Sequence, residues 1–160
     1  MSVNTVRAYL SAYGLEDRVM EFNVSSATVE LAAKALGTEP ARIAKSLCFQ
    51  LGDSYALVVV AGDARIQNAK FKAAFQVKAR MASPEDTLRV TGHAVGGVCP
   101  FALPQDAPVR TYLDVSLRRF DRVYPACGSS SSAIGLTCDE LYAASGAEGW
   151  VDVSALPDPA

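Results

Sequence analysis

The chain has 160 residues, of which 50% are hydrophobic and 20% are charged, and its formal net charge is −2. A chain of this length can bury roughly two-thirds of the surface that its unfolded form exposes, so we expect a single domain over residues 1–160. The small negative net charge is not that of a dedicated DNA- or RNA-binding protein, because such proteins are usually basic.

Membrane and secreted classes are also disfavoured. Met1–Leu10 lacks the apolar core of a signal peptide, and the longest apolar run, Tyr55–Ala61, is too short to span a bilayer. The four cysteines are widely spaced and form no C-x-x-C pair: Cys48, Cys99, Cys127 and Cys138. This spacing suggests neither a zinc site nor a disulfide framework, so we expect reduced thiols in a cytoplasmic protein.

Two short helices are predicted before the first strand. The first covers Val3–Tyr13 and ends at Gly14. The second begins at Ser25 or Ser26, either of which can cap its first turn, and ends at Gly37. Its apolar residues recur at i, i+3, i+4 and i+7, which places them on one helical face: Val29, Ala32, Ala33 and Leu36.

A β-hairpin is predicted next, with strands over Ser46–Leu51 and Tyr55–Ala61 joined by a tight turn at Gly52-Asp53. The residues from Ala56 to Ala61 are almost continuously apolar. This pattern is typical of a strand that is buried on both faces of a sheet.

The second half of the chain alternates helices and strands. Asn68–Phe75 is predicted to be an amphipathic helix whose inward residues are Phe71, Ala74 and Phe75. Ser83 caps another helix, which has Pro84 at its first position and ends at Gly92. The later predicted elements are strands over Val109–Leu113 and Arg122–Ala126, a helix from a capping box at Thr137 to Gly146, and a terminal strand over Trp150–Val153. We therefore expect an α/β (mixed α+β) fold with a mixed, barrel-like sheet surrounded by helices.

Basic residues are concentrated in two places. No acidic residue lies between Ala64 and Pro84, but five basic ones do: Arg65, Lys70, Lys72, Lys78 and Arg80. A second group follows later: Arg118, Arg119 and Arg122. Such groups can hold a few phosphates, although a run of charges is also typical of a solvated face.

Lys45 introduces the first predicted strand, and about fifty residues later the glycine-rich segment Thr91–Phe101 contains a Gly-x-x-x-Pro pattern from Gly96 to Pro100. This combination resembles the YbaK/ProX family, free-standing relatives of the editing domain of bacterial prolyl-tRNA synthetases. The resemblance runs from about Thr28 to Leu141, with the landmarks in order. It implies that the protein hydrolyses the ester that joins a wrong amino acid to the 3′ end of a tRNA.

The resemblance implies that Lys45, Gly96 and Gly97 are the catalytic residues. Water would attack the ester through an intermediate with negative charge on oxygen, so donors aimed at that oxygen are required. Residues without Cβ allow backbone N–H groups to approach a ligand and can adopt positive φ, and Pro100 makes the loop rigid. Without the resemblance, Lys45 could equally be a surface lysine and the glycines an ordinary turn.

Further residues are expected to contact the substrate: His93, Val98, Cys99, Pro100, Asp114, Gly128 and Ser129. His93 is the only histidine, so a thiol–imidazole mechanism would have to pair it with Cys99, but nothing in the sequence marks Cys99 for a depressed thiol pKa. Asp114 could orient a substrate hydroxyl, fix the glycine loop or cap a turn. The serine run from Ser129 to Ser132 departs from the polar and basic residues usual in the family, which argues against a tRNA contact there.

These observations predict a trans-editing aminoacyl-tRNA deacylase that requires no metal or cofactor and whose partners are an acylated tRNA and a synthetase, with no membrane and no DNA involved. No phosphate-binding or dinucleotide-binding glycine motif is present. Two alternatives stay open, namely a non-catalytic module that binds tRNA or a synthetase, and a Cys99/His93 thiol hydrolase. Cysteine, alanine, serine and threonine are all small enough to be the amino acid removed.

Overall fold

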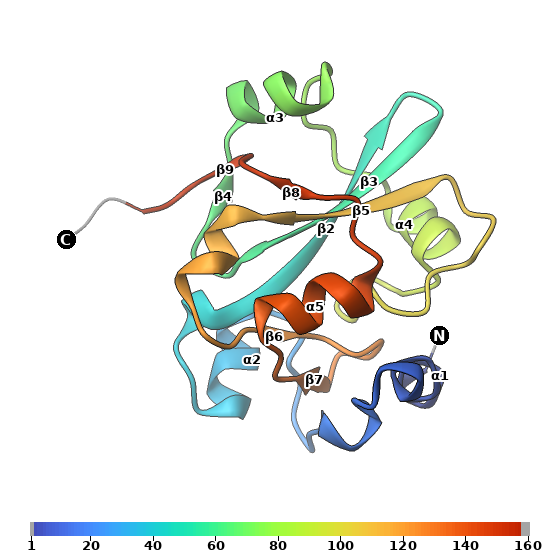
Figure 1. Cartoon of the computed structure of the whole chain (residues 1–160), viewed down its shortest axis with the longest axis vertical. Coiled ribbons are helices and arrows are strands. Elements are labelled where there is room, and N and C mark those ends of the chain that lie inside the picture. The colour runs from blue at the N-terminus through green and yellow to red at the C-terminus, as the bar shows by residue number, and fades with distance from the viewer. Residues whose placement is uncertain (1, 158–160) are drawn as a thin grey trace.

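A computed structural model describes residues 2–157, and a five-stranded mixed sheet lies at its centre (Figure 1). The strand order is β6 (Tyr124–Pro125), β2 (Ile43–Leu51), β3 (Ser54–Ala61), β5 (Val109–Asp114) and β8 (Trp150–Val151). Only β2 and β3 pair antiparallel, whereas the other three neighbouring pairs are parallel. The expected mixed sheet is therefore confirmed.

Two small antiparallel sheets accompany the central one: β1 (Val19–Glu21) with β7 (Ser132–Ile134), and β4 (Arg65–Ile66) with β9 (Ser154–Ala155). Hydrogen bonding leaves β6 and β8 at opposite edges of the central sheet. Within residues 2–157 the sheet thus does not close into the expected barrel, and each edge strand is only two residues long.

The predicted hairpin is confirmed. Its turn contains Gly52, which has a φ of 71° that favours glycine. Every residue from Tyr55 to Ala61 is buried, as the apolar run predicted. Strand β2 begins three residues earlier than expected, so Lys45 lies inside the strand, opposite Val60, and not in front of it.

Five α-helices surround the central sheet: α1 (Val3–Leu10), α2 (Val29–Leu36), α3 (Asn68–Phe75), α4 (Pro84–Thr91) and α5 (Cys138–Ser145). In Figure 1, α5 crosses in front of the sheet, α3 lies above it, and α1 and α2 lie below. Four short 3-10 helices link these elements: η1 (Ser11–Tyr13), η2 (Glu16–Arg18), η3 (Pro40–Arg42) and η4 (Val115–Arg119). None of the helices within the described part of the chain is long and apolar enough to cross a membrane.

The helix ends follow local side-chain chemistry. The Ser83 cap of α4 is confirmed, and so is the capping box of α5, in which Thr137 and Glu140 bond each other's backbone amides. The predicted cap of α2 is wrong, because the Thr28 hydroxyl, and not Ser25 or Ser26, accepts a bond from the third helical amide.

Other differences from the sequence prediction are confined to element ends. The first helix tightens into η1 after Leu10, and the strand predicted over 122–126 keeps only two residues, as β6. The terminal strand is broken into β8 and β9, and Ala74 of α3 is exposed. The short strands β1, β4 and β7 carry no marked alternation of apolar and polar residues, and the sequence did not predict them.

The core lies on both sides of β3. On one side an aromatic chain joins Phe49, Phe71, Phe75 and Tyr112, with ring centroids 4.7–5.1 Å apart from one ring to the next.

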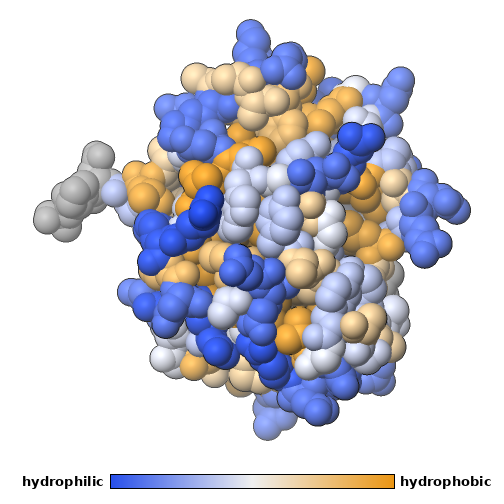
Figure 2. Space-filling view, viewed as in Figure 1, coloured by the Kyte–Doolittle hydropathy of each residue, from blue (hydrophilic) through white to orange (hydrophobic). Residues whose placement is uncertain are grey.

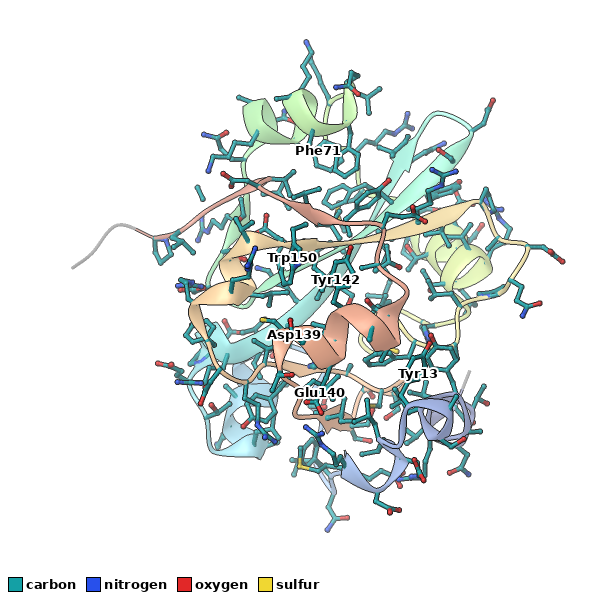
Figure 3. All side chains as sticks on the ribbon, in the orientation of Figure 1. Tyr13, Phe71, Asp139, Glu140, Tyr142 and Trp150 are labelled. Atoms are coloured by element: carbon teal, nitrogen blue, oxygen red, sulfur yellow. The ribbon has the colours of Figure 1, made fainter. Side chains whose placement is uncertain are left out.

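Figure 2 shows hydrophilic and hydrophobic residues interspersed over the front face of the molecule. In Figure 3, Tyr142 of α5 lies beside Trp150 of β8, with 6.0 Å between the ring centroids.

Candidate active site

A cavity of about 310 Å³ lies between β2, the start of α2 and the loop that follows α4. Its lining includes all of Ile43–Cys48 and the segment Ser26–Val29. Most of the other lining side chains are small or apolar, including Ala82, Ala126 and Ala133. The cavity can therefore take a small group, and the few polar atoms around it decide how that group is held.

Lys45 is the one lysine in the cavity lining. Its side chain is half-buried, and its Nζ donates a single long hydrogen bond of 3.5 Å to the carbonyl of Gly62. Burial lowers the pKa of Lys45 below its usual value, and the nearby Asp63 carboxylate raises it part of the way back. Among the described residues no carboxylate lies within ion-pair distance of this ammonium, so its charge is available to a ligand.

The loop after α4 supplies three further lining residues, Val95, Gly96 and Val98. Gly96 has a φ of 100°, a conformation that favours glycine. Within residues 2–157, no backbone or side-chain acceptor bonds the Gly96 or Val98 amide. These two N–H groups can donate to a bound oxygen, which is the function expected of the glycine loop.

Gly97 lies between them but has another role. Its amide donates to the Ala94 carbonyl at 3.0 Å, so it is already used in a turn. Its φ is not positive, contrary to the expectation from the glycine pair, and it is not part of the cavity lining. A Cβ at Gly97 would lie only 2.8–2.9 Å from backbone atoms of Ser129. This glycine therefore allows two loops to pack against each other.

His93 and Cys99 form a pair, with Nε2 and Sγ 3.4 Å apart, but both side chains are 0% exposed and neither lines the cavity. The Nε2–H of His93 donates to the Phe101 carbonyl at 2.7 Å, so this nitrogen is not free to accept the thiol proton. Burial lowers the pKa of His93 and raises the pKa of Cys99 to about 12. Both residues were expected to contact the substrate, and the structure places them in the core, outside the cavity lining.

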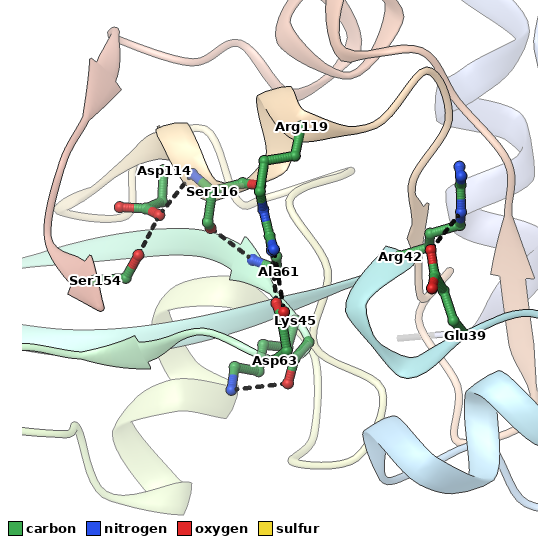
Figure 4. Close-up of polar contacts among 10 residues, drawn as sticks. Glu39, Arg42, Lys45, Ala61, Asp63, Asp114, Ser116, Arg119 and Ser154 are labelled. Carbon is green, nitrogen blue, oxygen red and sulfur yellow. Dashed lines mark hydrogen bonds and ion pairs between the residues drawn. The ribbon is translucent and has the colours of Figure 1, made fainter. Parts of the chain in front are cut away.

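Asp114 is likewise 0% exposed and far from being a free carboxylate. It accepts hydrogen bonds from the Ser116 amide at 3.0 Å and the Ser154 hydroxyl at 2.6 Å (Figure 4), and from the Val153 amide at 2.9 Å. It caps η4 and ties that turn to the chain between β8 and β9. Of the three roles considered from the sequence, the structure gives it the turn cap, and not a contact with the substrate or the glycine loop.

Three other expected contact residues, Pro100, Gly128 and Ser129, do not line the cavity. Pro100 is buried and does not line the cavity. Gly128 has a φ of 93°, and a Cβ there would lie 2.9 Å from a methyl group of Val6. The Ser129 hydroxyl accepts the Ser131 amide at 3.2 Å within its own loop. Packing in the interior explains Pro100 and Gly128, whereas Ser129 stabilises its own loop.

Two serines in the cavity lining were missed. The side-chain oxygens of Ser26 and Ser46 are buried and have no hydrogen-bond partner among residues 2–157. Ser26 is held beside the cavity by its amide, which donates to the Ser130 carbonyl at 2.5 Å. No signal in the sequence marked Ser46, because neighbouring strand residues point to opposite faces and Ser46 directly follows Lys45.

Three of the eight basic residues noted in the sequence are engaged with other side chains of the protein. Arg119 binds Asp63, Lys70 binds Asp152, and the Arg118 guanidinium lies 5.1 Å from the centre of the Trp150 ring. No group of three or more potential metal ligands occurs in the described portion of the chain.

Comparison with known families now adds to this geometry. Residues 24–143 match the model of the aminoacyl-tRNA editing domain. The chain belongs to this family. The matched segment contains the whole cavity lining, including Lys45 and the loop with Gly96.

Similar proteins include one full-length relative and several synthetases. The uncharacterized protein YwhH of Bacillus subtilis (strain 168) is 52% identical over 154 residues, which cover 96% of this chain and 97% of that protein. A proline–tRNA ligase of Thermotoga sp. (strain RQ2) is 35% identical over 77 residues, 48% of this chain but only 13% of the ligase.

Solved structures are also similar to this chain over most of its length. A protein described as a candidate trans-editing enzyme for prolyl tRNA synthetase superposes with a TM-score of 0.85 at 31% identity, covering 97% of this chain and 99% of the other. Hypothetical protein APE2540 superposes with a TM-score of 0.81 at 29% identity, over 94% of this chain and 99% of the other. Both comparisons support the editing-domain fold over almost the full length.

Proposed function

We propose that this protein is a trans-acting aminoacyl-tRNA deacylase that hydrolyses the ester of a small, wrongly attached amino acid. The observation that carries the proposal is the Lys45 ammonium, which has no ion pair and borders a small, largely apolar cavity. Membership of the editing-domain family supports the same conclusion. The reaction belongs in the cytoplasm, where charged tRNAs are found.

In the proposed reaction, water adds to the carbonyl carbon of the ester, and the bond from that carbon to the ribose oxygen then breaks. The free amides of Gly96 and Val98 would donate to the oxygen that becomes negative in the tetrahedral intermediate. Lys45 would bind the acylated adenosine and add positive charge beside it. A hydroxyl of the substrate's own ribose would help to position the water, since no side chain in the cavity is an evident general base.

The absence of an evident general base in the cavity favours a second candidate function. No carboxylate and no histidine belongs to the cavity lining found in the described residues, and general acid–base catalysis by a side chain usually relies on one of these. A non-catalytic module that binds acylated tRNA or a synthetase would keep the cavity without catalysing hydrolysis.

A deacylation assay separates the two. The purified protein is incubated with tRNAs that carry alanine, serine, threonine or cysteine wrongly, and with the same tRNAs correctly charged. We expect hydrolysis of at least one wrongly charged tRNA well above the spontaneous rate, and little hydrolysis of correctly charged ones. Tight binding of acylated tRNA with no hydrolysis would support the binding module instead.

A further inference from the structure

Lys45 has an unusual electrostatic environment for a residue that is to act as a cation. Its side chain is half-buried, which lowers its pKa, and three charged residues influence it: Asp63, Arg65 and Glu30. The other titratable side chains in the cavity lining are Cys48 and Tyr124. Burial raises the pKa of Cys48 to about 11, so this thiol carries no charge near neutral pH. The Asp63 carboxylate is the strongest of the influences that favour the charged ammonium.

Both oxygens of Asp63 already accept a hydrogen bond from another partner, Arg119. Its Oδ1 accepts from Nη2 of Arg119 at 2.6 Å, and its Oδ2 accepts from Nη1 at 3.1 Å. Arg119 is fixed in turn, because its Nε donates to the Ser116 carbonyl at 2.8 Å. The Arg119 guanidinium holds the pKa of Asp63 below its usual value. Both carboxylate oxygens therefore point to arginine, and Lys45 bonds the neighbouring carbonyl of Gly62 (Figure 4).

The segment that carries Gly62 and Asp63 is held on two further sides. The Ser116 hydroxyl accepts the Ala61 amide at 3.0 Å, which attaches the end of β3 to η4. Gly62 packs so closely that a Cβ there would overlap the Pro40 carbonyl oxygen and lie 2.8 Å from a methyl group of Val29. The carbonyl that Lys45 bonds, and the carboxylate next to it, are thus fixed relative to the cavity.

We propose that Asp63, held by Arg119, is a positioning residue that keeps the Lys45 ammonium charged without binding it directly. A carboxylate at this place opposes the effect of burial on the ammonium. A carboxylate that bound Lys45 directly would instead compete with the substrate for it, and the bidentate bond to Arg119 holds the carboxylate in an orientation directed at the guanidinium. The inference rests on the proposed role of Lys45 in binding substrate.

Two substitutions should shift the pKa of Lys45 in opposite directions. Asp63→Asn removes the negative charge but keeps the shape, so the pKa of Lys45 should fall further below its usual value. Arg119→Ala frees Asp63 to bind Lys45, so the pKa of Lys45 should rise. Asp63→Glu, which keeps the charge, should restore a value near that of the wild type. A purely structural role would not produce shifts of opposite sign.

The pKa of Lys45 is measured directly by NMR titration of the lysine side-chain signals, assigned by their loss in Lys45→Arg. This measurement needs no enzymatic activity, so it tests the positioning even where no deacylation is found. Asp121→Asn is the matched control, because it removes another carboxylate from an arginine, Arg42, at an exposed site. We expect the control to leave the Lys45 titration unchanged.

Kinetics provide the second measurement. The ammonium is lost as pH rises through the pKa of Lys45, so the alkaline loss of deacylation should begin at lower pH in Asp63→Asn and at higher pH in Arg119→Ala. Arg119→Ala should also raise KM about twofold to fivefold, the effect of a partly exposed ion pair that competes with substrate. Thermal melting checks that each variant is folded, and Arg119→Lys replaces Arg119→Ala if the latter unfolds. Identical Lys45 titrations in the wild type and both variants, or shifts of the same sign, would overturn the proposal.

Discussion

Lys45 and Asp114 are both charged residues that the sequence singles out on strands of the central sheet, yet they differ in burial and in hydrogen bonding. Asp114 is 0% exposed and accepts three hydrogen bonds of 2.6–3.0 Å from its own chain. Lys45 is half-buried beside a cavity and makes one long hydrogen bond. A charge whose bonding capacity is filled by the protein stabilises the fold, whereas a charge with unused capacity at a cavity can bind a ligand.

The largest effect on stability is expected at Asp114. Asp114→Ala leaves the Ser116 and Val153 amides and the Ser154 hydroxyl without their acceptor in the interior, which should lower the free energy of unfolding by about 3–5 kcal/mol. Activity per folded molecule should change little. Urea unfolding measures the loss, and Asp152→Ala, which removes an exposed partner of Lys70, serves as a control expected to cost less than about 1 kcal/mol. A stable Asp114→Ala protein without activity would show that Asp114 serves function and not stability.

At Lys45 we expect a large loss of activity with little loss of stability. Lys45→Ala should reduce deacylation about 10²-fold, the usual effect of removing one strong electrostatic donor. The melting temperature should stay close to that of the wild type, because the side chain makes only one long hydrogen bond. Lys72→Ala, at an exposed position of α3, is the matched control and should retain full activity. Near-normal turnover in a folded Lys45→Ala protein would remove Lys45 from the mechanism.

The glycine loop has two proposed roles, packing against the Ser129 loop through Gly97 and hydrogen-bond donation through the amides of Gly96 and Val98. A substitution at Gly97 tests whether these roles are coupled. Gly97→Ala places a Cβ 2.8–2.9 Å from the Ser129 backbone, so it should cost about 1–3 kcal/mol. It should also lower activity per folded molecule, because the shift displaces the neighbouring amides. At Gly149 a Cβ would meet nothing within 4 Å, so Gly149→Ala should change neither property. Normal specific activity in a destabilised Gly97→Ala protein would mean that the loop is only structural.

The smallest effect is expected at Cys99. Cys99→Ala should keep activity within about twofold of the wild type and cost on the order of 1 kcal/mol, as for a small cavity in the core. Its high pKa also predicts slow alkylation by iodoacetamide near neutral pH, because the thiolate is the reactive form. Loss of all activity, with an acylated enzyme detected by mass spectrometry, would favour the thiol-hydrolase alternative.

Much of the fold could be predicted because it depends on local patterns. The Gly52-Asp53 turn, the Ser83 and Thr137 caps and the apolar run of β3 each specify one element. The sequence also predicted strands at both edges of the sheet, over 122–126 and 150–153, but it did not predict how short they are. Strands β6 and β8 are two residues long and exist only because longer strands lie beside them.

The site was predicted less completely than the fold. Lys45 and Gly96, two of the residues predicted for the site, line the cavity. A cation and a glycine are visible in a sequence, but the positive φ of Gly96 is not. His93 and Asp114 looked equally functional, since a sequence does not show whether a polar group is already bonded inside the protein. Ser26 and Ser46 were missed for the converse reason, because only the structure shows that their hydroxyls lack partners at the cavity.

The central claim is that ligands bind at Lys45 and the glycine loop and not at the Asp114 end of the sheet. An adenosine that carries alanine or serine through a non-hydrolysable amide tests it most directly, by NMR titration of backbone amides and lysine side chains. The account predicts that the signals of Gly96, Val98 and Lys45 shift saturably, while those of Ser116 and Val153 beside Asp114 stay unchanged. Shifts centred on Ser116 and Val153, or no shift at the glycine loop under saturating analogue, would contradict it.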